Sequence, residues 1–180
     1  MKPLGRQEGV GLLEAAILAI LISLLIVVFF NRILAMSVAI ERESMRQTII
    51  HINSALNIEA LTLIVRDDQA GFEAREGMNP VDLMSPGPSR YAGSFSGPDP
   101  MQITPGTWYF DESMRQLVYR VNHVERFAGG RAIPERIRFQ VETVFDDVNG
   151  NGFKDAGEMY TGLKLRSIDN YEWLEAVENP

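Results

Sequence analysis

Cysteine is missing from the 180-residue chain, which excludes several kinds of structure and chemistry. No disulfide can hold a small exported domain together, and no thiolate can bind zinc or act as a nucleophile. Histidine occurs only at His51 and His123, and neither stands in a motif that would pair it as a base or as one of a set of metal ligands. We therefore expect that the chain is not an enzyme.

A cluster of positive charge is also missing. The formal net charge is −7, and the basic residues beyond position 10 are scattered among a larger number of acidic ones. Binding to nucleic acid depends on basic side chains that neutralise phosphates. We expect no nucleic-acid partner.

Glycine and proline do not occur anywhere from Leu12 to Ala70, whereas most of both residue types lie from Gly71 onward. These two residues are the main breakers of regular backbone. The sequence therefore predicts an α+β protein, with one long helix over residues 10–66 and a turn-rich head after it.

The helix begins with an apolar run, Val10–Phe30, which only Glu14 and Ser23 interrupt. At the rise of an α-helix the run spans ~31 Å, the thickness of a bilayer core. Lys2 and Arg6 precede it and favour a cytoplasmic N-terminus. Residues 10–30 are thus predicted to cross a membrane once, with the head on the side away from the cytoplasm.

Glu14 distinguishes between three interpretations of this run. A cleaved secretory signal should have an apolar region of only about 7–15 residues, and a plain signal anchor leaves the acid unexplained. A carboxylate in an apolar span costs roughly 2.5–3.5 kcal/mol on insertion scales and indicates a function. The competing explanation is that Glu14 reaches back to the lipid headgroups.

The third interpretation comes from the segment Gly9-Val10-Gly11-Leu12-Leu13-Glu14. It resembles the leader signal of type IV pilins and type II secretion pseudopilins, in which a short basic leader ends in Gly and Glu stands fifth after the cut. The resemblance implies that a prepilin peptidase removes residues 1–9 after Gly9 and methylates Val10. It also implies a pilin-like fold and insertion of the helix into a fibre.

A physical argument supports this use of Glu14. A buried charge is tolerated only when it is paired, and cleavage creates a cationic amine at Val10. The carboxylate of one subunit can then pair with the amine of a neighbour and set the axial register. The chain departs from the usual pattern at Val10, where Phe or Met is commoner, and at Asn31, where major pilins carry Pro.

Beyond the span, apolar residues recur at helical spacing and form one stripe, which predicts packing against a sheet or, alternatively, a coiled-coil partner. The stripe consists of Val38, Met45, Ile49, Ile52, Leu56, Ala60 and Leu63. Residues 67–105 are rich in Pro and Gly and are expected to form a connecting loop. Within it, Asn79–Leu83 and Tyr91–Gly93 resemble minor pilins of mannose-sensitive haemagglutinin type pilus systems.

Residues 106–180 are predicted to form a small antiparallel β head. Alternating patterns predict a hairpin from 107–110 and 116–121, a long strand at 137–145, and further strands at 160–168 and 171–174. The buried aromatic positions are expected to include Trp108, Tyr109, Tyr119 and Trp173.

Residues 147–158 match the twelve-residue calcium loop at every ligand position. The predicted ligands are Asp147, Asn149, Asn151, the carbonyl oxygen of Phe153, Asp155 and Glu158. Because strand patterns flank the loop, we expect it at the tip of a hairpin and not in an EF-hand. The alternative is a solvated Asn-Gly turn that binds nothing.

Three functions remain open from the sequence. The leading one is a minor pilin of a type IV pilus, with the prepilin peptidase and other pilin subunits as partners and calcium as the cofactor. The second is a pseudopilin of a type II secretion system. The third is a membrane-tethered calcium-binding domain that never polymerises.

Overall fold

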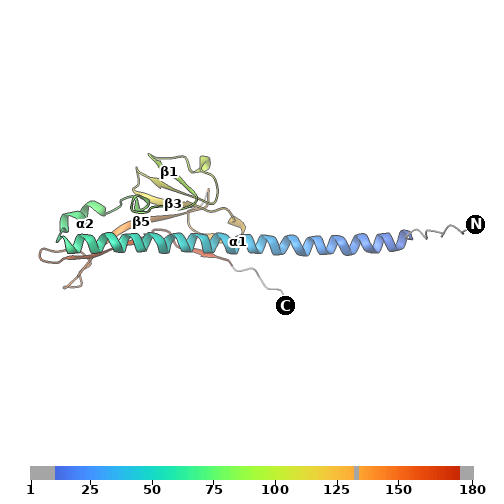
Figure 1. Cartoon of the computed structure of the whole chain (residues 1–180), viewed down its shortest axis with the longest axis horizontal. Coiled ribbons are helices and arrows are strands. Elements are labelled where there is room, and N and C mark those ends of the chain that lie inside the picture. Colours follow the sequence, from blue (N-terminus) through green and yellow to red (C-terminus); the bar gives the residue numbers. More distant parts are fainter. Residues whose placement is uncertain (1–10, 132–133, 175–180) are drawn as a thin grey trace, which may run out of the picture. The chain divides into compact units, whose positions relative to one another are not determined.

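The computed structural model describes residues 11–131 and 134–174, without the side chains of residues 34 and 35. The chain divides into two compact units, Met1–Ala39 and Ile40–Pro180. It is an α+β protein with one long N-terminal apolar helix and a small mixed sheet (Figure 1).

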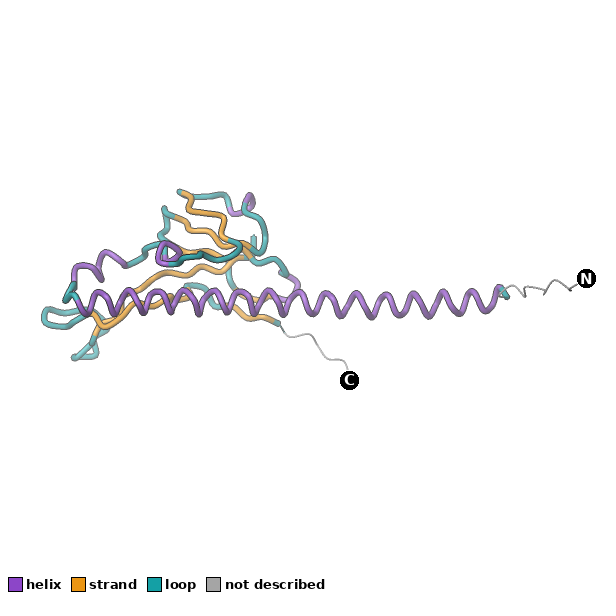
Figure 2. Tube along the Cα trace, in the orientation of Figure 1, coloured by secondary structure: helices purple, strands orange, loops and turns teal. Residues whose placement is uncertain are grey.

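The helices and strands follow one another in an order that begins with the long helix (Figure 2). The α-helices are α1 (Leu12–Val65) and α2 (Gln69–Arg75), and the short 3-10 helices are η1 (Pro80–Leu83), η2 (Pro100–Gln102) and η3 (Val124–Arg126). The strands are β1 (Tyr91–Phe95), β2 (Thr107–Asp111), β3 (Gln116–Arg120), β4 (Phe127–Gly129), β5 (Arg136–Phe145), β6 (Tyr160–Ser167) and β7 (Tyr171–Trp173).

A tight turn ends α1 and starts α2. Asp67 adopts a positive φ of 53°, and the Asp68 carboxylate accepts a hydrogen bond from the Gly71 N–H at 2.8 Å, which caps α2. A Cβ at Gly71 would lie 2.6 Å from Leu63 Cδ2 and closer still to the Asp68 carboxylate. Close packing therefore favours Gly71 here, because a larger residue would displace the Asp68 and Leu63 side chains, and α1 ends at Val65, near the expected end at residue 66.

Strands of the main sheet run in the order β1-β2-β3-β5-β6, with β4 and β7 forming a separate pair. Strands within the predicted head, residues 106–180, pair antiparallel as expected, but β1 from the preceding segment pairs with β2 in parallel and makes the sheet mixed. The segment 67–105 is more than a loop, since it contains α2, η1, β1 and η2. Residues 96–106, which carry η2, bring the chain back so that β2 runs in the same direction as β1.

The core of the second unit lies between α1 and one face of the sheet. Five of the seven predicted stripe residues of α1 are buried, namely Met45, Ile52, Leu56, Ala60 and Leu63. On β5, burial alternates as predicted through Ile137, Phe139 and Val141, as expected for a strand with one face in the core. All four predicted aromatic positions are buried, and the Trp108 ring lies 4.8 Å from the Tyr119 ring and 5.6 Å from the Phe139 ring.

The opposite face of the sheet is mainly polar, with a small apolar cluster of Ile103, Tyr109 and Val118. Arg138 on β5 forms two side-chain hydrogen bonds with Asp169, which follows β6, at 2.7 and 3.0 Å. The Asp169 carboxylate also accepts the Arg138 backbone N–H at 3.0 Å. These contacts fix the turn that leads from β6 into β7.

Replacing Asp169 with Asn should destabilise the fold by about 2 kcal/mol, because it leaves the guanidinium half of a partly buried pair without its carboxylate. The hydrogen bonds from Arg138 lower the pKa of Asp169. A lowered folded-state pKa adds stability above the ordinary range near about pH 4, and that stability disappears as the pH falls through the folded value. Urea unfolding at several pH values between neutral and acid would measure this. The difference in unfolding free energy between wild type and Asp169→Asn should become smaller as the pH falls.

Glu142→Gln serves as the matched control, since Glu142 pairs on the same face with the exposed Lys164 and Arg166. Exposed pairs contribute only about 0–1 kcal/mol. An equal loss of unfolding free energy in Asp169→Asn and Glu142→Gln would contradict a special role for Asp169.

Candidate functional site

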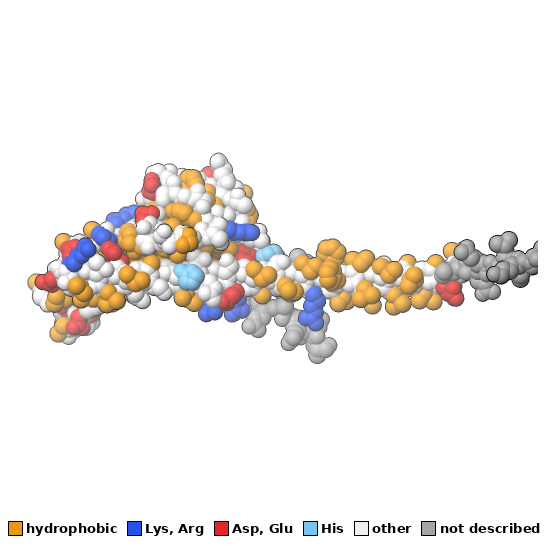
Figure 3. All heavy atoms as spheres, viewed as in Figure 1, with side chains coloured by type: hydrophobic (Ala, Val, Ile, Leu, Met, Phe, Trp, Pro, Cys, Tyr) orange, Lys and Arg blue, Asp and Glu red, His pale blue; other side chains and the backbone are white. Residues whose placement is uncertain are grey.

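The first unit carries the apolar span and Glu14. Side chains along α1 from Leu12 to Phe30 are exposed, and this stretch is long and apolar enough to cross a membrane (Figure 3). Ser23 donates its hydroxyl to the Ala19 carbonyl at 2.8 Å, so its polar group is satisfied within the helix. Apolar side chains exposed on every side of this stretch of α1 favour a lipid or protein environment around it.

Glu14 lies in the first turn of α1, and its carboxylate accepts a hydrogen bond from the Gly11 N–H at 3.2 Å. The side chain therefore reaches back toward the N-terminal end of the helix, where free N–H groups and the helix dipole favour negative charge. Gly9 and Val10, the predicted cleavage and methylation positions, lie outside the described residues.

The predicted calcium loop joins β5 to β6, so it lies at a hairpin tip as expected. Asp147 organises its first half. One carboxylate oxygen accepts the N–H groups of Gly150 at 2.7 Å and Asn151 at 3.1 Å, and the other accepts the Gly152 N–H at 2.8 Å. Gly152 has the positive φ of 77° that the sharp turn requires.

The other predicted ligands converge on Asp155 and Glu158. The amide groups of Asn149 and Asn151 both donate to the same Asp155 oxygen, at 2.6 and 2.8 Å. Glu158 is buried and accepts the N–H groups of Val148 and Asp155 with separate oxygens, both at 2.9 Å. The five residues predicted to bind through carboxylate or amide groups are thus linked to one another by side-chain and backbone hydrogen bonds.

This network fits a hard cation in its donor chemistry, which is oxygen from carboxylates and amides. Rotating the Asn149 and Asn151 amides by half a turn would present their oxygens in place of their nitrogens. Among the described residues, no group of three or more His, Asp or Glu side chains is placed to hold a metal ion. A cation in this loop would therefore depend on the two asparagine oxygens as well as on carboxylates.

The base of the loop is tied to α2. The Tyr160 N–H donates to the Gln69 side-chain oxygen at 2.9 Å, and the Tyr160 ring stacks on Phe72 at 5.5 Å. Lys154, within the loop, lies 4.7 Å above the same Tyr160 ring. The position of the loop is therefore coupled to the turn that follows α1.

A buried carboxylate in α1 was missed by the sequence analysis. Glu41 is only 8% exposed and accepts three hydrogen bonds: from the Tyr119 hydroxyl at 2.9 Å, the Asn122 N–H at 2.7 Å and the His123 N–H at 3.0 Å. The His123 ring lies 4.0 Å from the same carboxylate. One signal in the sequence could have revealed this burial. Glu41 lies three residues after Val38 and four before Met45, which places it on the apolar stripe of the helix.

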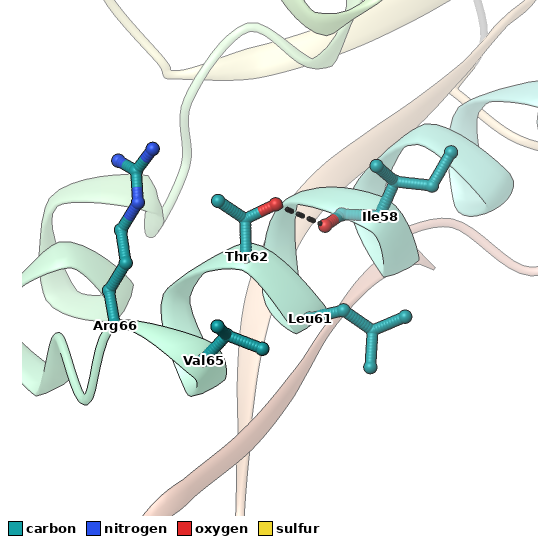
Figure 4. A pocket seen from close by; sticks show the side chains of 5 residues that line it. All are labelled: Ile58, Leu61, Thr62, Val65 and Arg66. Atoms are coloured by element: carbon teal, nitrogen blue, oxygen red, sulfur yellow. Dashed lines mark hydrogen bonds between the residues drawn. The ribbon is translucent and has the colours of Figure 1, made fainter.

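Apolar side chains also cover the surface of α1 that points away from the sheet. Ile58, Leu61 and Val65 are 67%, 62% and 86% exposed, and with Thr62 and Arg66 they line a shallow groove (Figure 4). The Thr62 hydroxyl donates to the Ile58 carbonyl at 2.9 Å, so the one hydroxyl in the groove is satisfied internally. Such a patch on a helix that already buries its other face indicates a contact surface.

No protein-family model, curated protein or solved structure matches this chain.

Proposed function

We propose that the chain is a minor pilin or pilin-like structural subunit of a type IV pilus. In this proposal a prepilin peptidase cuts after Gly9, and the mature chain lies in the bacterial inner membrane with its head in the periplasm. The single observation that carries the proposal is Glu14, an acid in the first turn of a long apolar stretch of helix, whose carboxylate accepts the N–H of Gly11, the second residue after the proposed cut. Assembly into an extracellular fibre would follow from the membrane-bound state.

The outward face of α1 favours a subunit that polymerises over a lone tether. A tether that works alone has no need of apolar residues on the helix surface opposite its core, since water would surround them. The exposed side chains on this surface are nevertheless apolar, namely Ile58, Leu61 and Val65. In a fibre a neighbouring subunit would cover them.

A pseudopilin of a type II secretion system is the second candidate, because it would use the same anchor and the same Glu14. The oxygen-rich hairpin loop in a chain without cysteine fits this candidate equally well. The genes that flank the coding sequence would separate the two, since one set encodes pilus components and the other secretion components.

Mass spectrometry of the chain extracted from membranes tests the proposal. We expect a mature form that lacks residues 1–9 and begins with N-methylated Val10. Replacing Gly9 with Val should leave the leader attached, whereas Gly5→Val, in the same leader, should not. A wild-type chain that keeps Met1 would contradict the proposal and favour the membrane tether.

We propose in addition that the loop 147–158 binds calcium and that the ion stabilises the head. Bound ligand stabilises a folded state by RT ln(1 + [L]/Kd), or about 2.7 kcal/mol at a hundredfold excess over Kd. Removing calcium from the full-length chain in detergent should therefore lower its Tm by several degrees, and calcium added back should restore it.

Asp155→Ala is the variant that should abolish this response, because Asp155 is the side chain on which both asparagine amides converge. Asp99→Ala is a suitable control, since Asp99 lies outside the loop and caps η2. A melting curve of the wild type that is identical with chelator and with calcium would remove the metal from the proposal.

A further inference from the structure

The hairpin loop between β5 and β6 contains both of the Asn-Gly pairs in the sequence, Asn149-Gly150 and Asn151-Gly152. We propose that Asn149 and Asn151 are sites of spontaneous deamidation and that the modification opens the loop. This inference is independent of the proposed function, since it depends only on the chemistry and contacts of the loop.

The reaction needs a backbone nitrogen that can reach the side chain before it. The glycine nitrogen forms a bond to the asparagine Cγ, and the side-chain nitrogen leaves as ammonia with the proton of the glycine amide. Water then opens the resulting succinimide ring to aspartate or isoaspartate. Glycine favours the first step because it has no side chain to shield its nitrogen and restricts the backbone least.

No neighbouring atom crowds this reaction, and the step it requires of the loop is that the N–H groups of Gly150 and Gly152 leave the Asp147 carboxylate that accepts them. All four residues are exposed, and Gly150 and Gly152 have no atom within 4 Å of the place where a Cβ would stand. Asn57 offers a contrast, because it lies within α1, where the backbone is held by the helical hydrogen-bond ladder. Asn79 precedes a proline, whose nitrogen has no proton to lose.

The contacts of the two asparagines determine the effect of the change. Both amide groups now donate to the same Asp155 oxygen, at 2.6 and 2.8 Å, and so offset its charge. Deamidation replaces each donor with a carboxylate, which can only accept. Three negative groups would then face one another, and their repulsion would push the loop open unless a cation joined them.

The first test follows the modification itself in the full-length chain. The protein in detergent micelles is incubated with a chelator at mildly alkaline pH, and the peptides are analysed by mass spectrometry. We expect a gain of about one dalton at Asn149 and Asn151, faster than at Asn57 by about an order of magnitude. Equal rates at the three positions would overturn the proposal.

Two glycine variants make this test specific. Gly150→Ala should suppress the mass gain at Asn149 and leave the mass gain at Asn151 unchanged. Gly157→Ala is the control, because Gly157 shares the positive φ and the open surroundings but follows an alanine. Undiminished modification of Asn149 in Gly150→Ala would also overturn the assignment.

A second measurement addresses the opening of the loop. The variant Asn149→Asp/Asn151→Asp reproduces the modified charges, and Asn149→Ser/Asn151→Ser removes the amides without adding charge. In chelator, we expect faster backbone hydrogen exchange over residues 147–158 in the aspartate variant than in the serine variant. Equal exchange in the two variants would show that charge does not open the loop.

Discussion

Replacing Glu14 with Ala is expected to leave removal of residues 1–9 largely intact and to abolish incorporation of the chain into fibres. In the proposed assembly the Glu14 carboxylate of one subunit pairs with the Val10 amine of the next in an environment without water. Removing one partner of a buried pair costs roughly 3–5 kcal/mol, because the other charge stays buried and unpaired. Each subunit contact would weaken by about two to four orders of magnitude, which is enough to prevent polymerisation.

The measurement is the amount of the chain in sheared and purified fibres, relative to the amount in the membrane. Glu14→Gln keeps the shape of the side chain without its charge, and it should fail as Ala does. Ser23→Ala is the control, because its hydroxyl bonds only to its own helix. If Glu14→Ala entered fibres as well as the wild type, the pairing between carboxylate and amine would be excluded.

Replacing Glu41 with Ala should destabilise the head by about 3 kcal/mol. The substitution leaves the Tyr119 hydroxyl and the N–H groups of Asn122 and His123 without their acceptor in a mostly buried place, and each unsatisfied donor costs about 1–3 kcal/mol. The expected loss of stability is smaller than the sum of these three penalties, because Asn122 is exposed and water can reach its N–H.

Tyr119 connects this site to pH. Burial, followed by the nearby Glu41 carboxylate, raises the pKa of Tyr119 well above its ordinary value. The hydroxyl therefore stays protonated as a donor, and its contribution to stability is present below about pH 10 and is lost as the pH rises further. Tyr119→Phe should remove part of this alkaline sensitivity together with one of the three hydrogen bonds to Glu41.

Urea unfolding of the full-length chain in detergent would measure both effects. Glu43→Ala is the matched control in the same helix, because Glu43 is exposed and pairs only with neighbours one turn away, Arg46 and Gln47. We expect its loss of stability to stay within about 0.5 kcal/mol. If Glu41→Ala lost no more stability than this control, the buried hydrogen bonds of Glu41 would make no net contribution to the stability of the head.

Local pattern in the sequence was sufficient for the long helix, most of its buried stripe, the strands of the head other than β4, and the placement of the loop 147–158 between two strands. Each of these depends on residues close together in the chain. The alternation through Ile137, Phe139 and Val141 shows which face of β5 is buried without any knowledge of what covers it. Glu14 can likewise be recognised from the sequence alone as an acid within an apolar run, because the acid and the run lie in the same short segment.

Strand β1 was hidden because its sequence, with Ala92, Gly93 and Ser94 at its centre, lacks the apolar alternation of a strand. Its parallel pairing with β2 depends on how residues 96–106 return the chain, which no short window of sequence describes. Glu41 belongs to the same class. A charged residue on the buried side of α1 makes sense only once the donors of Tyr119, Asn122 and His123, about eighty residues further along the chain, are brought to it.

The sequence by itself thus determined the long helix, most strands of the head, and the positions of Glu14 and of the loop 147–158 in the chain, since helical and strand periodicity and turn-forming residues act over a few positions. Only the tertiary structure decided the partners: Glu41 with the segment after β3, and the two asparagine amides with Asp155. The physical reason is that hydrogen-bond partners distant in the chain are selected by packing of the whole core, which sets the register of one element against another.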